Sequence, residues 1–274
     1  MTFTTYTGVP LPSFMYGTAW KKDETARLVK RALASGFTAI DTANQLIHYE
    51  EALVGEAVKD VPRDTLFLQT KFTSAGGQDH RTPYDRSASL TDQVRQSFES
   101  SLKHLHTDYL DSYVLHGPHT RRGLTDADWE VWAALESLQR SGKARAIGIS
   151  NVSSEQLAAL LAKASVQPAF VQNRCYAVTG WDRETRAICR AHGIVYQGFS
   201  LLTANAEVIG DAAMRTIAER VNAGVAQVVF RFAQQIGMLP LTGTTSERHM
   251  KEDLGCDRFT LTPSELLTIE GIGL

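Results

Sequence analysis

The chain has 274 residues, 43% of them hydrophobic, so it is long enough to bury a sizeable core within one domain. Its 28 basic and 30 acidic side chains give a net charge of -2, which indicates neither a nucleic-acid partner nor an anionic membrane. The three cysteines, Cys175, Cys189 and Cys256, lie far apart in the sequence, so they predict structural thiols and neither a disulfide framework nor a metal site.

The first residues, MTFTTYTGVPLP, contain neither a basic segment nor an apolar one of the kind that directs secretion. No apolar run approaches the roughly 18 residues that a membrane-spanning helix needs. We therefore expect a cytoplasmic protein that acts on a small molecule, as a monomer or a weak homo-oligomer.

Short β-rich runs alternate with longer segments of helical periodicity along the chain. Each run is apolar through its middle and ends in small or polar residues, which is typical of a parallel strand that is covered on both faces. The eight runs are SFMYG (13–17), TAID (38–41), LFLQT (66–70), DSYVLH (111–116), RAIGIS (145–150), AFVQN (169–173), IVYQGFS (194–200) and MLPLTG (238–243).

Polar capping residues open the helical segments between these runs. Asp23 is the expected N-cap of the first helix, and the pairs Thr125/Asp128 and Ser153/Gln156 have the spacing of capping boxes. Eight strands alternating with helices predict a (β/α)8 TIM barrel that spans residues 1–274 as a single domain. A doubly wound open sheet gives a similar order of elements, but no GxGxxG turn follows an early strand.

Three polar residues at the ends of successive predicted strands are the first candidates for chemistry. Asp41 ends TAID, Lys71 follows LFLQT, and His116 ends DSYVLH. The active site of a barrel is built at the C-terminal ends of its strands. A lysine directly after a buried strand needs a partner, and Asp41 on the neighbouring strand is the natural counter-ion. His116 beside this pair is a candidate acid, base or substrate-orienting donor.

These residues stand in stretches that resemble the aldo-keto reductases in order and over nearly the whole chain. The stretches are GFTAIDTANQ and EEALVGEAV, the lysine after LFLQT, the histidine of YVLHGP, SGKARAIGISN and FVQN. The resemblance implies an NADPH-dependent enzyme that reduces aldehydes and ketones to alcohols, with NADH as a possible cofactor. It also implies that Asp41, Lys71 and His116 are three members of a catalytic tetrad.

The resemblance further assigns residues to the nicotinamide end of the cofactor. Three polar residues match the positions that hold its carboxamide, and an aromatic residue with two neighbours matches the position that stacks on its ring. These residues are Ser150, Asn151 and Gln172 for the carboxamide, and Phe199, Ser200 and Leu202 for the ring.

The fourth tetrad member does not align. In the family a tyrosine follows the aspartate by five positions, and here Leu46 occupies that place. We infer a longer loop that brings in Tyr49 or, as an alternative, His48 as proton donor. Hydride transfer to a carbonyl leaves an alkoxide that needs a proton, and a lysine ammonium near a phenol lowers the phenol pKa. A structural Tyr49, with His116 or water as the donor, remains the third interpretation.

The segment PLTGTTSERHMKEDL resembles the part of the family that binds the adenosine 2′-phosphate and adenine. Backbone N–H groups and hydroxyls at a helix N-terminus suit a phosphate. Many members have a lysine after the proline, where this chain has Leu241, so use of NADH stays open. The implied contacts are Gly243, Thr244, Thr245 and Arg248 for the phosphate, and Glu252 and Asp253 for the adenine.

On the substrate side, Trp20 resembles the family's pocket-lining tryptophan and His48 is expected at the mouth of the barrel. Two other functions stay open. Lys71 could form a Schiff base in a barrel aldolase. Alternatively, the barrel could bind nucleotide as a redox-sensing or interaction module with little turnover.

Overall fold

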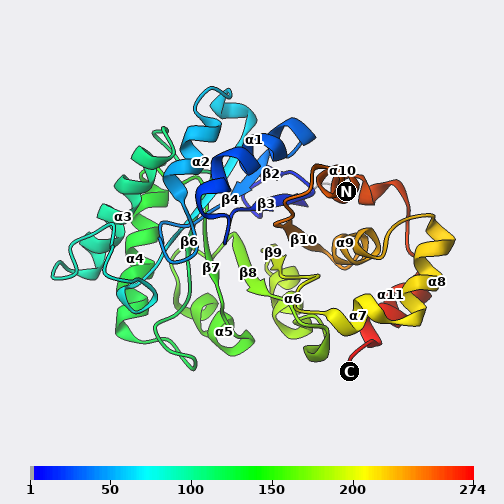
Figure 1. The fold of residues 1–274 in the computed structure, drawn as a ribbon. Helices are drawn as coiled ribbons and strands as arrows, with labels where there is room; N and C mark the ends of the chain where they lie inside the picture. Colours follow the sequence, from blue (N-terminus) through cyan, green and yellow to red (C-terminus); the bar gives the residue numbers. More distant parts are fainter. Residues whose placement is uncertain (1–2) are drawn as a thin grey trace.

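The computed structural model of the protein describes residues 3–274, which form a closed barrel of eight parallel strands. Figure 1 shows the helices arranged around the outside of these strands. The order around the barrel is β10-β3-β4-β5-β6-β7-β8-β9, so the predicted (β/α)8 barrel is confirmed and the open sheet is wrong. The barrel strands are β3 (Met15–Gly17), β4 (Ala39–Asp41), β5 (Phe67–Phe72), β6 (Ser112–Leu115), β7 (Ile147–Ser150), β8 (Phe170–Arg174), β9 (Val195–Phe199) and β10 (Met238–Thr242).

The helices follow the strands in the alternation that the sequence predicts. None of the helices formed by residues 3–274 is both long and apolar enough to cross a membrane. Their bounds are α1 (Thr25–Ser35), α2 (Glu51–Val58), α3 (Leu90–His104), α4 (Asp126–Arg140), α5 (Ser154–Lys163), α6 (Arg183–Ala191), α7 (Ala206–Gly210), α8 (Ala212–Val221), α9 (Val225–Gln235), α10 (Glu247–Leu254) and α11 (Pro263–Gly271).

Two of the three predicted helix starts have the expected caps. Both capping boxes are present, with Thr125 at the start of α4 and Ser153 at the start of α5. The prediction for Asp23 is wrong. Asp23 lies inside the 3-10 turn η1 (Lys22–Glu24), and α1 begins only at Thr25 without a side-chain cap. An N-cap residue has a non-helical backbone. Asp23 is already part of a 3-10 turn, so it cannot be the N-cap of α1.

The N-terminal end of the barrel is closed by apolar side chains. A small antiparallel hairpin, β1 (Phe3–Thr4) and β2 (Pro10–Leu11), buries Phe3 and Leu11 in one cluster with strand residues such as Met15, Phe67 and Phe170. Polar side chains in the lumen therefore lie toward the opposite end, where the strands end and the connecting loops begin.

Helices α2 and α3 approach each other closely at Gly55, which lies inside α2. A Cβ atom at this position would lie 1.7 Å from the carbonyl oxygen of His104 and 3.1 Å from the Cα of Leu105. Both atoms belong to the backbone, so a side chain at residue 55 would force the helices apart. The fixed position of α2 matters because the loop between β4 and α2 carries the candidate tyrosine.

We expect Gly55→Ala to lower the free energy of unfolding by about 1–3 kcal/mol because the backbone must move to admit the methyl group. Urea denaturation measures this change. Gly210→Ala is the matched control, since a Cβ at Gly210 meets nothing within 4 Å. Equal stability of the two variants would show that α2 and α3 are not held together at this contact.

Candidate active site

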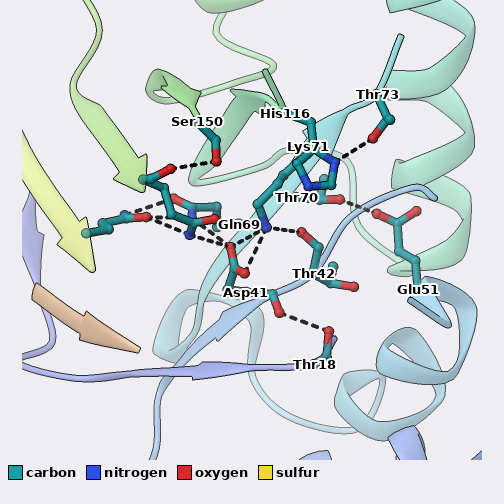
Figure 2. Close-up of polar contacts among 12 residues, drawn as sticks. Thr18, Asp41, Thr42, Glu51, Gln69, Thr70, Lys71, Thr73, His116 and Ser150 are labelled. Carbon is teal, nitrogen blue, oxygen red and sulfur yellow. Dashed lines mark hydrogen bonds and ion pairs between the residues drawn. The ribbon is translucent and has the colours of Figure 1, made fainter. Parts of the chain in front are cut away.

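A buried ion pair joins the ends of β4 and β5. The Nζ of Lys71 lies 2.8 Å from Oδ1 and 2.8 Å from Oδ2 of Asp41, and it donates a third hydrogen bond of 2.8 Å to the carbonyl oxygen of Thr42 (Figure 2). Lys71 is 1% exposed and Asp41 is 3% exposed. Burial lowers the pKa of Lys71 and the Asp41 carboxylate opposes that change. The three acceptors use all three ammonium protons, so Lys71 is fully satisfied.

Amide groups complete the surroundings of the Asp41 carboxylate. Its Oδ1 accepts hydrogen bonds from Nε2 of Gln69, at 2.7 Å, and from Nε2 of Gln172, at 3.0 Å. Both glutamines also donate to Oε1 of Gln197, which lies on β9. Asp41 therefore has charged and neutral donors at once, and this satisfies a carboxylate that is almost out of contact with solvent.

The loop between β4 and α2 contains an exposed turn. The backbone N–H of Tyr49 donates to the carbonyl oxygen of Gln45 at 3.1 Å, and the side chain of Gln45 accepts the N–H of His48. Leu46 and Ile47 lie at the tip, 37% and 42% exposed. The turn keeps Leu46 out of the cavity wall and returns the chain to the barrel at Tyr49.

A buried carboxylate fixes the residue at which the loop ends. Glu51, the first residue of α2, accepts a hydrogen bond from the hydroxyl of Thr70 and lies 2.8 Å from Nδ1 of His104. These partners belong to β5 and α3. Glu51 thereby ties the start of α2 to the barrel wall, only two residues after Tyr49.

Tyr49 lies between the lysine and the histidine. Its ring centroid is 5.2 Å from Nζ of Lys71 and 6.0 Å from the ring centroid of His116. The side chain lines the central cavity, and its hydroxyl makes no hydrogen bond with residues 3–274. Burial and the Asp41 carboxylate raise the pKa of Tyr49. The expectation that this pKa is lowered is wrong for this state, because burial and the Asp41 charge both raise it.

His116 is held as a neutral side chain. Its Nδ1 lies 2.7 Å from the hydroxyl of Thr73, which leaves Nε2 without a hydrogen bond among residues 3–274. Burial, with smaller contributions from Lys71 and His48, lowers the pKa of His116 to about 3. A neutral imidazole with one nitrogen anchored can present the other to a substrate oxygen.

One cavity of about 630 Å³ lies at the C-terminal end of the barrel and contacts most of the predicted site. Asp41, Tyr49 and His116 line it, while Lys71 lies behind them. Ten of the residues predicted to contact the nicotinamide, phosphate or adenine also line it: Ser150, Asn151, Gln172, Phe199, Ser200, Leu202, Gly243, Thr244, Glu252 and Asp253.

Besides Lys71, four predicted residues do not line this cavity. Thr245 follows the cavity-lining Thr244, and Arg248 extends outward, where its side chain is 73% exposed and pairs with Glu252 at 2.9 Å. Trp20 is 66% exposed and lies against His48, with 4.1 Å between the ring centroids. Trp20 and His48 form an aromatic pair outside the cavity wall. A substrate contacts this pair only if it extends beyond the cavity.

Basic side chains that the sequence did not single out surround the loop after β10. Nζ of Lys21 donates to the carbonyl oxygen of Gly243, and Arg31 donates to that of Thr245 at 3.3 Å. Burial lowers the pKa of Lys21. Lys21 directly follows Trp20 beyond the end of a predicted strand, and no motif there marked it as a cofactor contact. The Gly224–Gln227 segment at the start of α9 also lines the cavity and carried no signal in the sequence.

Asp253 brings a buried carboxyl group to the cavity wall, next to Glu252. It is 3% exposed, and its Oδ2 accepts the hydroxyl of Thr242 at 2.8 Å. Burial raises the pKa of Asp253 to about 7, against the effect of the Thr242 hydrogen bond. The carboxyl group is therefore partly protonated at neutral pH, where it can donate as well as accept a hydrogen bond.

Comparisons with known proteins agree with this geometry. The sequence model of the Aldo/keto reductase family matches residues 13–273. Glyoxal reductase of Bacillus subtilis is 30% identical over 271 residues, which is 97% of this chain and 91% of that protein. The NAD/NADP-dependent indole-3-acetaldehyde reductase of Schizosaccharomyces pombe is 28% identical and covers 97% and 92% of the two chains.

A solved structure shows the same fold over the same length. The aldo/keto reductase from Brucella melitensis superposes with a TM-score of 0.85, at 27% identity, over 98% of each chain. Its similarity and the family match together cover the barrel, the buried ion pair and the cavity. The chain therefore belongs to the aldo/keto reductase family and is an NAD(P)H-dependent oxidoreductase that reduces carbonyl groups.

Proposed function

We propose that this enzyme reduces small aldehydes and ketones with NADPH and that Tyr49 is its proton donor. The observation that carries the proposal is the position of Tyr49, which lines the cavity beside His116 with Lys71 against its ring. Its hydroxyl has no partner among residues 3–274, so it is free to bind a substrate oxygen. His48 does not line the cavity, which favours Tyr49 over the alternative donor.

Each of the four residues has a separate role in the proposed reaction. NADPH supplies the hydride that adds to the carbonyl carbon. Tyr49 gives its proton to the oxygen as negative charge develops there, and the products are an alcohol and NADP+. Nε2–H of neutral His116 donates to the same oxygen and orients it. Lys71 stabilises the phenolate that is left, and Asp41 holds Lys71 in place.

The cavity wall suits a nicotinamide ring and its carboxamide. The side-chain oxygen Oε1 of Gln172 accepts no hydrogen bond from residues 3–274, while its Nε2 is bonded to Asp41 and Gln197, so Oε1 can accept a bond from an amide N–H. Ser150 donates to the backbone oxygen of Gln172 at 2.6 Å, and Asn151 donates to that of His116 at 2.8 Å. These bonds fix the wall that the carboxamide would contact. Phe199 offers a ring face in the same cavity.

Three cations around residues 243–248 support a preference for NADPH over NADH. Lys21 and Arg31 contact the loop through its backbone oxygens, and Arg248 is exposed on the first turn of α10. A 2′-phosphate adds negative charge that such groups recognise. Many family members have a lysine where this chain has Leu241. Here the positive charge comes instead from Arg31 on α1, Arg248 on α10 and Lys21 in the loop after β3.

Neither alternative function has comparable support. A Schiff-base lysine must reach the substrate as a free amine, but Lys71 lies behind the cavity with all its protons bonded. A purely nucleotide-binding module would not need Tyr49 and His116 to line the same cavity. Because one relative is named a glyoxal reductase, small dicarbonyls belong in the substrate panel.

We expect Tyr49→Phe to lower kcat for carbonyl reduction at least roughly 100-fold, because it removes the proton donor and keeps the ring. The assay follows NADPH oxidation at 340 nm with a panel of aldehydes, ketones and dicarbonyls. His48→Phe is the control and should retain most activity. Full activity of Tyr49→Phe would remove the tyrosine from the mechanism.

His116 should stay neutral throughout the physiological range. Its folded-state pKa of about 3 lies below the unfolded value of about 6.5, so the unfolded chain binds the extra proton. His116 therefore lowers stability as the pH falls from about 6.5 toward 3. NMR of ¹⁵N-labelled histidine, assigned with His116→Gln, should show no His116 titration from pH 8 to 5. A midpoint near pH 6.5 would contradict this.

Arg248→Ala should raise the KM for NADPH roughly tenfold and leave the KM for NADH unchanged, because only NADPH carries the 2′-phosphate. Steady-state kinetics with both cofactors measure the two values. Lys251→Ala, on the same helix and paired with Glu247, is the control. Equal catalytic efficiency of the wild type with NADH and NADPH would contradict a 2′-phosphate contact.

A further inference from the structure

Four polar side chains form a layer across the lumen of the barrel, below the catalytic lysine. Asp41 and Gln69 are register partners on β4 and β5, and Gln172 and Gln197 are register partners on β8 and β9. In the closed barrel, β4 lies opposite β8 and β5 lies opposite β9. Gln69 and Gln197 are each 0% exposed. Two amide groups thus meet in the middle of a core that apolar side chains could fill.

The two central amides are bonded to each other in both directions. Nε2 of Gln69 donates to Oε1 of Gln197 at 2.8 Å, and Nε2 of Gln197 donates to Oε1 of Gln69 at 3.0 Å. Gln69 also donates to Asp41, and Oε1 of Gln197 also accepts from Gln172 at 3.0 Å. The pair connects the catalytic aspartate on one side of the barrel to the cavity wall on the other. Figure 2 shows Gln69 in contact with Asp41.

The charge of Asp41 permits only one orientation of these amides. A carboxylate accepts hydrogen bonds and cannot donate them, so Gln69 and Gln172 must both turn Nε2 toward it. Gln197 receives a donor from each and must turn Oε1 toward them. Reversing any amide would set two oxygens against each other in a dry core, where unpaired polar atoms are costly.

These hydrogen bonds hold the side-chain oxygen of Gln172 toward the cavity as an acceptor. With both contacts of Nε2 used by Asp41 and Gln197, Gln172 has only its carbonyl oxygen left for a ligand. A nicotinamide carboxamide presents N–H donors to that oxygen. Without Gln197 the amide keeps one anchor and can rotate, so the acceptor is no longer held toward the cavity.

We propose that Gln69 and Gln197 are positioning residues that fix the Gln172 amide for recognition of the cofactor carboxamide. Neither residue lines the cavity, and both act through Gln172. The inference rests on the proposed function, because it needs Gln172 to contact the nicotinamide. A purely structural role would change stability and leave cofactor recognition as it was.

The first test compares Gln197→Met with Gln234→Met in the full-length protein. Gln234 is also a buried glutamine, 1% exposed, whose amide donates to Ser13 at 3.0 Å and does not line the cavity. Isothermal titration calorimetry gives Kd for NADP+, and thermal unfolding gives Tm. We expect Gln197→Met to raise Kd roughly tenfold. Gln234→Met should lower Tm with Kd unchanged.

A cofactor analogue tests whether the carboxamide is the group that is recognised. In 3-acetylpyridine adenine dinucleotide phosphate a methyl ketone replaces the carboxamide, so no N–H faces Gln172. Gln197→Met should therefore weaken NADP+ and leave the Kd of the analogue close to the wild-type value. Equal weakening of both ligands would overturn the proposal, because the variant would then act on the pocket as a whole.

Gln197→Glu keeps the test valid if the methionine variant does not fold. A protonated glutamic acid has one acceptor and one donor and can replace the glutamine, whereas the carboxylate cannot donate to Gln69. Burial and the charge of Asp41 oppose ionisation. The Kd of Gln197→Glu for NADP+, divided by the wild-type Kd, should be near one at pH 6 and should rise at pH 9. A constant ratio would contradict the inference.

Two failures can be distinguished. A wild-type protein that neither binds NADP+ nor reduces any carbonyl compound would refute the proposed function, and the inference with it. Wild-type turnover together with an unchanged Kd in Gln197→Met and Gln69→Met would refute the inference alone. Because the two amides act as one unit, the double variant should bind no more weakly than the worse single variant.

Discussion

The arrangement of the site depends on the buried ion pair between Asp41 and Lys71. Removing two charges from water carries a penalty of several kcal/mol per ion, which the pair offsets only when its remaining donors and acceptors are satisfied. Lys71 meets this requirement with the carboxylate and the Thr42 carbonyl oxygen, and Asp41 meets it with two amides. The need to satisfy this pair explains why polar residues gather at one end of an otherwise apolar barrel.

The same pair does not depend on the loop that follows β4. Asp41 and Lys71 are held by adjacent strands, so a change in the length of that loop would not move them. Leu46 and Ile47 lie in an exposed turn of the loop, while Glu51 anchors the start of α2 to Thr70 and His104. Tyr49, beside that anchor, lies against the lysine, although the resemblance to the family places the tyrosine at position 46. Position in space, and not spacing in sequence, decides which residue faces the cavity.

The sequence predicted those features that follow from strand periodicity. Eight apolar runs with polar ends specify a parallel barrel, and Asp41 and His116 were found because they interrupt that pattern. Gln69 and Gln197 were missed because each lies inside an apolar run, where a single glutamine looks like an ordinary strand residue. Their importance depends on partners four strands away across the barrel, which no local pattern encodes. Lys21 was missed for a similar reason, since its contact with Gly243 joins the two ends of the sequence.

The raised pKa of Tyr49 determines which protonation state the tyrosine has in the resting site. A phenol that ionises only well above neutral pH is a proton donor in the resting site and not a base. An alkoxide is about as basic as hydroxide, whose conjugate acid has a pKa of roughly 16, so it can take a proton even from such a phenol. Oxidation of an alcohol would instead need the phenolate as base, and burial and the Asp41 charge both disfavour that ion. The charge of Asp41 therefore helps to keep Tyr49 protonated, which is the state that carbonyl reduction requires of the proposed donor.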